Sequence, residues 1–82
     1  MKLSAAGNTE VPAYLVLKEM GFKISVIEIE SSEQLWTAQK QGLELNGASP
    51  LELLGLAQLV QCRGTNWRAN DKEIDDFVTR YC

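Results

Sequence analysis

Few residues of this chain could carry out chemistry, because its 82 residues include no histidine. Without an imidazole there is no Ser-His-Asp or Cys-His nucleophile system, no Cys₂His₂ zinc site and no side chain with an ordinary pKa near neutrality. The two cysteines, Cys62 and Cys82, cannot hold zinc by themselves. No paired constellation of carboxylates, hydroxyls or thiols takes the place of histidine, so we expect a non-catalytic protein without a cofactor or a metal ion.

Cys62 and Cys82 could form a disulfide, since both are expected near the junction of the last two predicted helices. The N-terminus has no basic region followed by an apolar stretch, so export is not expected. In the reducing cytoplasm thiols normally stay free. We therefore expect free thiols, with a Cys62–Cys82 bridge as the alternative.

An acidic cluster marks the start of the last predicted helix. It consists of Asp71, Glu73, Asp75 and Asp76. Its spacing does not fit the calcium loop of an EF-hand, whereas negative charge near a helix N-terminus is favoured by the helix dipole. The simplest interpretation is a solvated helix face, and the alternative is a surface for a basic protein partner. Acidic residues near a predicted hairpin add to this character, namely Glu28, Glu30, Glu33 and Glu44.

Two tryptophans are candidate anchors of a protein interface. Trp67, followed by Arg68, lies in a predicted loop between helices, and both residue types are enriched among binding hot spots. In a domain this small a loop tryptophan more often folds back over the core. Trp36 lies in a predicted strand on the same face as Gln34 and Ala38, and this mixed face is either core or an exposed surface used for pairing.

The segment Gly7-Asn8-Thr9 joins a short predicted strand, residues 2–6, to a predicted helix over residues 9–20. Free amides and the dipole of a helix N-terminus can hold an anion, which makes these three residues a candidate ligand site. The segment lacks the GxGxxG and GxxxxGK[ST] patterns of phosphate-binding loops. A plain turn with Asn8 or Thr9 as the helix cap is therefore the simpler interpretation.

An antiparallel meander is predicted after the first helix. Gly21 is placed to end that helix in a left-handed conformation, with Phe22 touching Leu17 as in a Schellman motif. Residues 22–30 alternate as a strand does, except at the adjacent pair Val26-Ile27, which indicates either a bulge or a strand covered on both faces.

Two more strands are expected to complete this meander. Ser31-Ser32 is predicted as a turn, residues 34–38 as the second strand, and Lys40-Gln41-Gly42 as a short hairpin loop with glycine in the left-handed position. The third strand begins at Leu43 and ends at Asn46-Gly47.

Ser49-Pro50-Leu51-Glu52 predicts the start of a second helix, with serine as N-cap, proline at the first position and glutamate completing a capping box. The following residues are apolar over more than one stripe, which indicates the most buried helix of the domain, and Gly64 is expected to end it. Gly55 in its interior costs about 1 kcal/mol relative to alanine, so we expect another backbone to approach it closely.

A third helix is predicted from the repeated capping pattern Asn70-Asp71-Lys72-Glu73. Its apolar residues follow the i, i+3, i+4, i+7 spacing of one helix face. They are Ile74, Phe77, Val78 and Tyr81. We expect this face to dock on the rest of the domain.

The predicted order β-α-β-β-β-α-α describes one α+β domain over residues 1–82, with a small mixed or antiparallel sheet and helices packed on one face.

Apolar runs are too short for a membrane helix, and a formal net charge of −3 without a basic run argues against nucleic acid as a partner. We expect a cytoplasmic, bacterial-type interaction module that acts as a homodimer or on a protein partner, for example as an immunity-type inhibitor of a basic toxin. The alternative is a protein that binds a small anion at Gly7-Asn8-Thr9.

Overall fold

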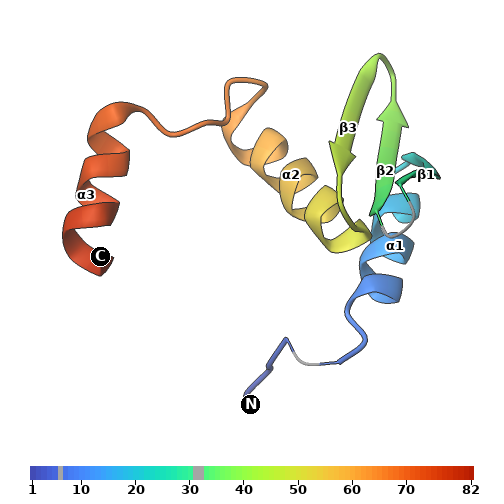
Figure 1. Cartoon of the computed structure of the whole chain (residues 1–82), viewed down its shortest axis with the longest axis horizontal. Coiled ribbons are helices and arrows are strands. Elements are labelled where there is room, and N and C mark those ends of the chain that lie inside the picture. Colours follow the sequence, from blue (N-terminus) through green and yellow to red (C-terminus); the bar gives the residue numbers. More distant parts are fainter. Residues whose placement is uncertain (6, 31–32) are drawn as a thin grey trace.

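The computed structural model describes residues 1–5, 7–30 and 33–82, and it confirms the α+β class (Figure 1). The elements are α1 (Glu10–Glu19), β1 (Lys23–Glu30), β2 (Glu33–Lys40), β3 (Leu43–Gly47), α2 (Pro50–Arg63) and α3 (Asp71–Tyr81). The three strands form an antiparallel sheet in the order β1-β2-β3, as the predicted meander requires.

The connection between β2 and β3 is a two-residue turn. Lys40 pairs with Leu43 across the ladder, and the two residues between them have positive φ angles, 48° at Gln41 and 82° at Gly42. Two consecutive residues with positive φ define the type I′ turn, whose twist matches that of the flanking strands. The predicted hairpin with a left-handed glycine is therefore confirmed, whereas the predicted turn at Ser31-Ser32 lies outside the described residues.

The predicted N-terminal strand is wrong for residues 2–5, which form no strand, while Ala6 lies outside the described residues. Leu3 is 87% exposed, so it contributes nothing to the core. The pairs that hold the sheet join β1 to β2 and β2 to β3. A strand needs a neighbouring strand to satisfy its backbone hydrogen-bonding groups. A short segment with suitable residues does not form a strand unless another strand pairs with it.

Helix α1 ends as its sequence predicts. The amide of Gly21 donates to the carbonyl of Lys18 at 3.0 Å, and the amide of Phe22 donates to the carbonyl of Leu17 at 3.1 Å. Gly21 has φ 97°, so these two bonds complete a Schellman motif. At the start of α1, Thr9 is the N-cap, but its side chain makes no capping hydrogen bond.

Helix α2 begins at the predicted cap. Ser49 accepts the amide of Glu52 at 3.2 Å, and Glu52 returns a bond to the amide of Ala48 at 3.2 Å, one residue earlier than a standard capping box requires. A second carboxylate reaches this helix start, since Glu10 of α1 accepts the amide of Leu51 at 2.9 Å. The bonds from the amides of Leu51 and Glu52 satisfy donors that the first turn of α2 leaves without a helical partner.

The expected close approach at Gly55 is wrong. A Cβ atom at Gly55 would meet nothing within 4 Å, and the residue is exposed. The close contact lies instead at Gly47, where an added Cβ would come within 3.4 Å of both Glu52 and Leu53. The glycine that permits tight packing of β3 on α2 is thus the one that ends the strand.

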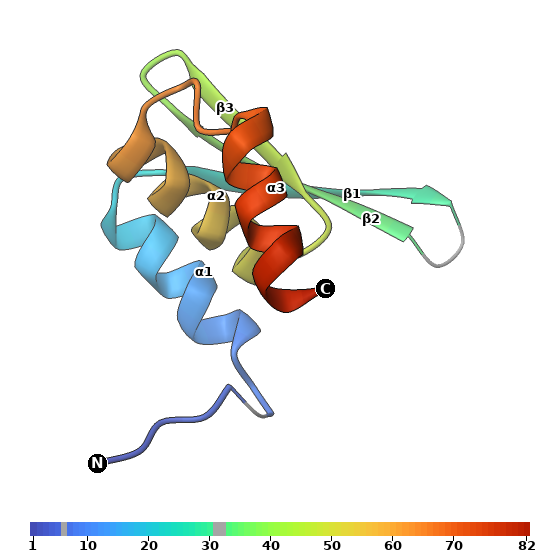
Figure 2. The ribbon, with the colours of Figure 1, turned by 90° about the vertical axis from the view of Figure 1, so that its left-hand side faces the viewer.

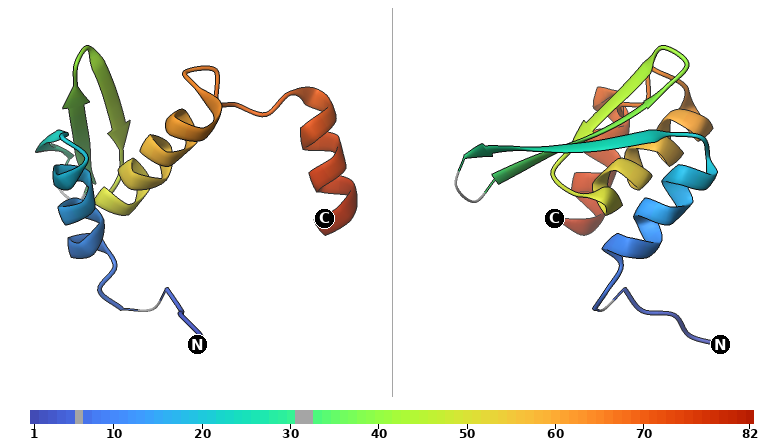
Figure 3. Two further views of the ribbon diagram at one scale, coloured as in Figure 1. Left: turned by 180° about the vertical axis from the view of Figure 1, so that it is seen from behind. Right: turned by 90° about the vertical axis from the view of Figure 1, so that its right-hand side faces the viewer.

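The core lies between one face of the sheet and the two helices α1 and α2, which pack side by side (Figures 2 and 3). Leu17 and Leu53 are both 0% exposed and form its centre. The remaining buried members of this cluster are Phe22, Ala38, Leu45 and Ala57. Helix α2 also buries Pro50, so it contributes more buried residues than α1, as its apolar sequence predicts.

The far half of β1 extends past the helices, and the β1–β2 hairpin projects from the body (Figure 2). Val26 and Ile27 point to opposite faces and are both exposed, at 43% and 60%. Neither expected explanation of this pair holds: the register irregularity lies between Glu28 and Glu30, and neither face is covered here. This part of β1 therefore carries apolar residues on both faces of the sheet, and no other element that the structure describes packs on either of them.

Helix α3 stands clear of the other elements (Figures 1 and 3). None of its residues is buried, and none belongs to the core cluster. The prediction that its apolar face docks on the domain is therefore wrong for this arrangement. Helical periodicity shows which side of a helix must be covered, but it does not say which surface covers it.

Candidate protein-interaction surface

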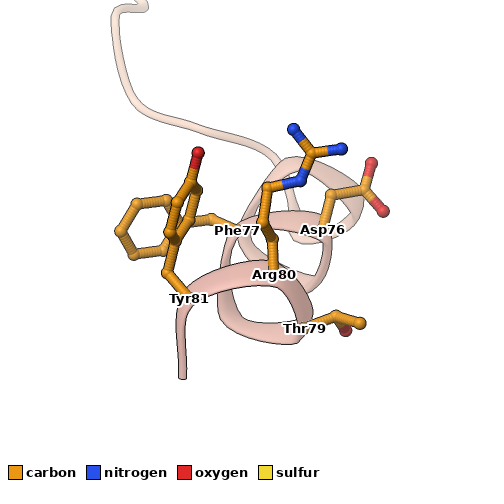
Figure 4. Close-up of a pocket in the computed structure, with 5 residues that line it drawn as sticks. All are labelled: Asp76, Phe77, Thr79, Arg80 and Tyr81. Atoms are coloured by element: carbon orange, nitrogen blue, oxygen red, sulfur yellow. The ribbon is translucent and has the colours of Figure 1, made fainter.

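Helix α3 exposes an apolar face to solvent. This α3 apolar face consists of Ile74, Phe77, Val78 and Tyr81. Phe77 is 59% exposed and Tyr81 is 69% exposed, and their ring centroids lie 5.2 Å apart at an angle of 45°. Figure 4 shows the two rings together on one side of the helix, away from Asp76 and Thr79. Paired aromatic rings on an exposed helix are typical of a binding surface.

The start of α3 is held by a full capping box, as predicted. Asn70 Oδ1 accepts the amide of Glu73 at 2.8 Å, and Glu73 Oε1 accepts the amide of Asn70 at 2.9 Å. Arg63, the last residue of α2, donates through Nη2 to Glu73 at 3.2 Å and through Nε to the carbonyl of Trp67 at 2.9 Å. One guanidinium therefore ties together the end of α2, the connecting loop and the first turn of α3.

These contacts explain the electrostatics of Glu73. The amide hydrogen bond from Asn70 holds the pKa of its carboxyl below the ordinary value of 4.5, and the charge of Arg63 adds to this effect. Both partners of the ion pair are partly exposed, at 43% and 44% of their side-chain areas. An ion pair of this kind orients the chain more than it stabilises the fold.

A hollow of about 440 Å³ lies beside Trp67 on the exposed side of α2, and we name it the Trp67 groove. It is lined by Asn46, Glu52, Gly55, Leu56, Leu59 and Trp67. Most of its lining is apolar, and Leu59 is 41% exposed. Gly55 leaves this part of the α2 surface bare, because no side chain projects from it. The groove is thus a second unpartnered apolar surface.

Trp67 and Arg68 lie together at one end of this groove. Trp67 is half-buried, and the guanidinium of Arg68 lies 5.2 Å from the centre of its ring, within the range of a cation–π contact. The loop tryptophan therefore covers part of α2 while it keeps one side open. This half-exposed state within an apolar patch is what a partner-binding tryptophan requires.

The acidic cluster of α3 forms no metal site. Asp71, Asp75 and Asp76 are exposed, and Glu73 is engaged by Asn70 and Arg63. Within residues 1–5, 7–30 and 33–82, no group of three or more carboxylates or thiols is placed to hold a metal ion. The cluster supplies negative charge along the polar side of α3.

Three acidic residues of the sheet have side chains that the structure describes, namely Glu28, Glu33 and Glu44. Glu44 lies on the sheet face opposite the helices, where it accepts from Gln39 at 2.8 Å and from Asn46 at 3.3 Å. These two bonds, the one from Gln39 first, hold the pKa of Glu44 below its ordinary value of 4.5. Glu28 and Glu33 lie on the projecting hairpin, and both are exposed.

Trp36 lies away from the α3 apolar face. It is half-buried, packs against the core cluster, and donates from Nε1 to Gln34 Oε1 at 3.3 Å. It shares its sheet face with Ala38, which is fully buried beneath the helices. The sequence left open whether this face is core or an exposed surface used for pairing, and the structure places Trp36 at the edge of the core.

The segment Gly7-Asn8-Thr9 borders a shallow hollow at the start of α1. Asn8 and Thr9 line it together with apolar residues of both helices, which are Pro12, Ala13, Val16, Leu51 and Leu54. The amide of Thr9 already donates to the carbonyl of Gly7 at 2.9 Å. The carboxylate of Glu10 stands next in the chain and bonds to the start of α2. The only feature at this segment that favours an anion is therefore the N-terminus of α1 itself, so these observations add no support to the hypothesis of an anion site.

Cys62 and Cys82 are free and exposed. Cys62 Sγ accepts a contact from Gln58 Nε2 at 3.3 Å on α2, while Cys82 ends the chain beyond α3. Cys62 therefore lies in α2 and Cys82 is the C-cap of α3, a helix that adds no residue to the core cluster. The disulfide that the sequence left open is not formed in this arrangement.

Sequence reasoning singled out Trp67 but missed the groove beside it, and it also missed the role of Arg63. A signal for the groove was present, since α2 carries more leucines than one buried stripe needs, among them Leu56 and Leu59. The bond from Arg63 to Glu73 spans a loop whose path the sequence does not define, so no local signal points to it. No helix in the described ranges is both long enough and apolar enough to cross a membrane.

Comparison with protein-family models, with curated proteins and with solved structures found no match for this chain.

Proposed function

We propose that this chain is a non-catalytic protein-interaction module and that the α3 apolar face is its main binding surface. The observation that carries the proposal is an amphipathic helix with every residue exposed, including two aromatic rings. A helix of 11 residues is marginally stable in water without tertiary contacts. Burial of its apolar face against another protein supplies the missing contacts.

The charge and cysteine content fit the same proposal. The acidic residues of α3 lie beside its apolar face and can form the polar rim that surrounds the centre of a protein interface. Two free, exposed thiols suit a reducing compartment, which supports a cytoplasmic location.

Site-specific photo-crosslinking tests this function. A benzoylphenylalanine side chain placed at position 77 should give one discrete crosslinked protein product in cells that express the chain. The matched control carries the same probe at position 79, since Thr79 projects from the opposite side of the helix from the rings (Figure 4). Equal crosslinking from both positions, or none from position 77, would contradict an interface on the α3 apolar face.

A further inference from the structure

Two of the apolar surfaces that the described residues leave uncovered suit each other. One is the α3 apolar face, a convex row with two aromatic rings. The other is the Trp67 groove, a concave surface along α2. Leu56 and Leu59 lie three residues apart on α2, so they form a ridge on one side of that helix, and Gly55 leaves a bare position beside it. A second helix packs well on such a surface because its side chains fit between these residues.

We propose that α3 of one copy docks in the Trp67 groove of a second copy, and that two copies exchange their α3 helices reciprocally. This inference rests on the proposed function and names the partner as a second copy of this chain. The exchange places the same two surfaces in contact twice, so it closes a two-fold symmetric dimer and leaves no open binding end.

The distribution of charge gives the docked helix a direction. Arg68 lies at the Trp67 end of the groove, and Glu52 lies toward the start of α2. Helix α3 carries acidic residues in its first turn and Arg80 in its last turn. These charges are complementary when α3 runs antiparallel to the α2 helix that receives it, with Arg80 at the Glu52 end.

The link between α2 and α3 keeps α3 away from the groove of its own chain. Arg63 bonds to both the carbonyl of Trp67 and the carboxylate of Glu73, and Gly64 turns the chain with φ 80°. Beyond these contacts α3 diverges from α2 (Figures 1 and 3). A second copy can occupy the groove while all these bonds stay intact, whereas closure onto the same chain requires the link to bend.

The area available is sufficient for a stable dimer. A buried aromatic side chain covers about 150–250 Å². Phe77 is 59% exposed and Tyr81 is 69% exposed, so docking can bury roughly 200–300 Å² of the two rings in each copy. Ile74, Val78 and the lining of the groove add to this area, and the exchange doubles it. The total is on the order of the roughly 1,600 Å² that specific protein interfaces bury.

The decisive experiment is size-exclusion chromatography with light scattering on the full chain and on two variants. The wild-type protein should have twice the 9.1 kDa mass of the chain. Phe77→Ser removes the donor surface and Leu59→Ser removes the groove, so each variant alone should fall to the monomer mass. A mixture of the two variants should recover a dimer, since one intact helix then meets one intact groove. Thr79→Ser is the matched control on α3 and should stay dimeric.

Folding of the variants is checked by circular dichroism and urea unfolding. Phe77 and Leu59 are both substantially exposed, so we expect the core to fold in each variant. The mixing step keeps the test sharp, because two unfolded variants cannot restore a dimer.

Other outcomes overturn the exchange in distinguishable ways. A dimer that survives Leu59→Ser but not Phe77→Ser would show that two α3 helices pack on each other, and a monomer whose α3 amides exchange freely would show that the helix awaits a different protein. Both outcomes reject the second copy as occupant of the groove and leave the proposed function standing. A monomer with protected α3 amides would show that α3 closes on its own groove, which would reject both proposals.

Discussion

Two glycines of this chain have opposite conformational requirements, which makes them a matched pair for mutation. Gly21 has φ 97° at the end of α1, a region that side chains with a Cβ adopt at a cost. Gly55 lies inside α2 with no atom within 4 Å of an added Cβ. We expect Gly21→Ala to destabilise the protein by about 1 kcal/mol or more, and Gly55→Ala to stabilise it by about 0.5–1 kcal/mol. Urea unfolding measures the change in the free energy of unfolding for both variants. A change of the same sign in the two variants would contradict the opposite conformational requirements of Gly21 and Gly55.

Leu53 lies at the centre of the core, fully buried between α2 and the sheet. Leu53→Ala should lower the free energy of unfolding by about 2–5 kcal/mol, because the lost methyl groups leave a cavity. This is a large part of the 5–15 kcal/mol that holds a typical domain. Leu51→Ala on the same helix is the control, since Leu51 is 43% exposed and should cost about 1 kcal/mol or less. Comparable losses in both variants would show that the core is centred elsewhere.

At the scale of the elements, the first turn of α3 should respond to pH through Glu73. The pKa of its carboxyl is lowered in the folded chain by the Asn70 amide and the Arg63 charge, so ionised Glu73 favours the folded turn. This contribution is fully present above the ordinary pKa of 4.5 and is lost as the pH falls through the lower folded value. Backbone chemical shifts of residues 71–81 should therefore move toward coil values below about pH 4.5.

The variant Glu73→Gln provides the control for this pH effect. Its amide oxygen can still accept the Asn70 amide, but it does not titrate. In this variant the backbone chemical shifts of residues 71–81 should lose most of their dependence on pH below about pH 4.5. An unchanged acid transition in Glu73→Gln would assign the effect to the other carboxylates of the helix.

Local signals predicted the elements well because their causes lie within a few residues. The Schellman end at Gly21, the turn at Gln41-Gly42 and the caps at Ser49 and Asn70 each depend on bonds between near neighbours. The failed expectations are the strand over residues 2–5, the close approach at Gly55, the explanation of the Val26-Ile27 pair and the docking of α3, and each depends on which distant segment lies alongside. A single sequence does not contain that information.

The candidate site was predicted in part for the same reason. The spacing of Ile74 and Phe77 correctly identified an apolar face, and Trp67 was correctly singled out as a loop residue. Arg63 bonds across the loop to Trp67 and Glu73, and in this arrangement α3 stands off the domain with its apolar face exposed. Nothing in the helical period specifies this arrangement, so the docked helix predicted from sequence became an exposed one.

At the scale of the whole molecule, the chain divides into a packed body and an appended helix. The core cluster draws on α1, the sheet and α2, and among the described residues the side-chain hydrogen bonds between α3 and the body all involve Glu73 in its first turn. Helix α3, proposed as the main binding surface, is therefore separate from the elements that give the protein its stability, whereas the Trp67 groove lies on one of those elements, α2. A change in α3 can alter assembly without altering the fold of the body.

This division predicts the behaviour of a chain that ends at Ala69. It keeps every residue of the core cluster and both carboxylates that cap α2, Glu10 and Glu52. At protein concentrations where the full chain is monomeric, its free energy of unfolding should lie within about 1 kcal/mol of the full chain. Where the full chain is dimeric, the full chain should unfold at a higher temperature that rises with protein concentration, because association stabilises only the folded state.

The shortened chain should show no such dependence on concentration, since it keeps the Trp67 groove but lacks the helix that fills it. Thermal unfolding followed by circular dichroism at several protein concentrations measures both chains. A shortened chain that fails to fold would show that the body needs an α3 helix for its stability, either its own or that of a second copy. That result would contradict the division of the chain into a self-sufficient body and an appended helix.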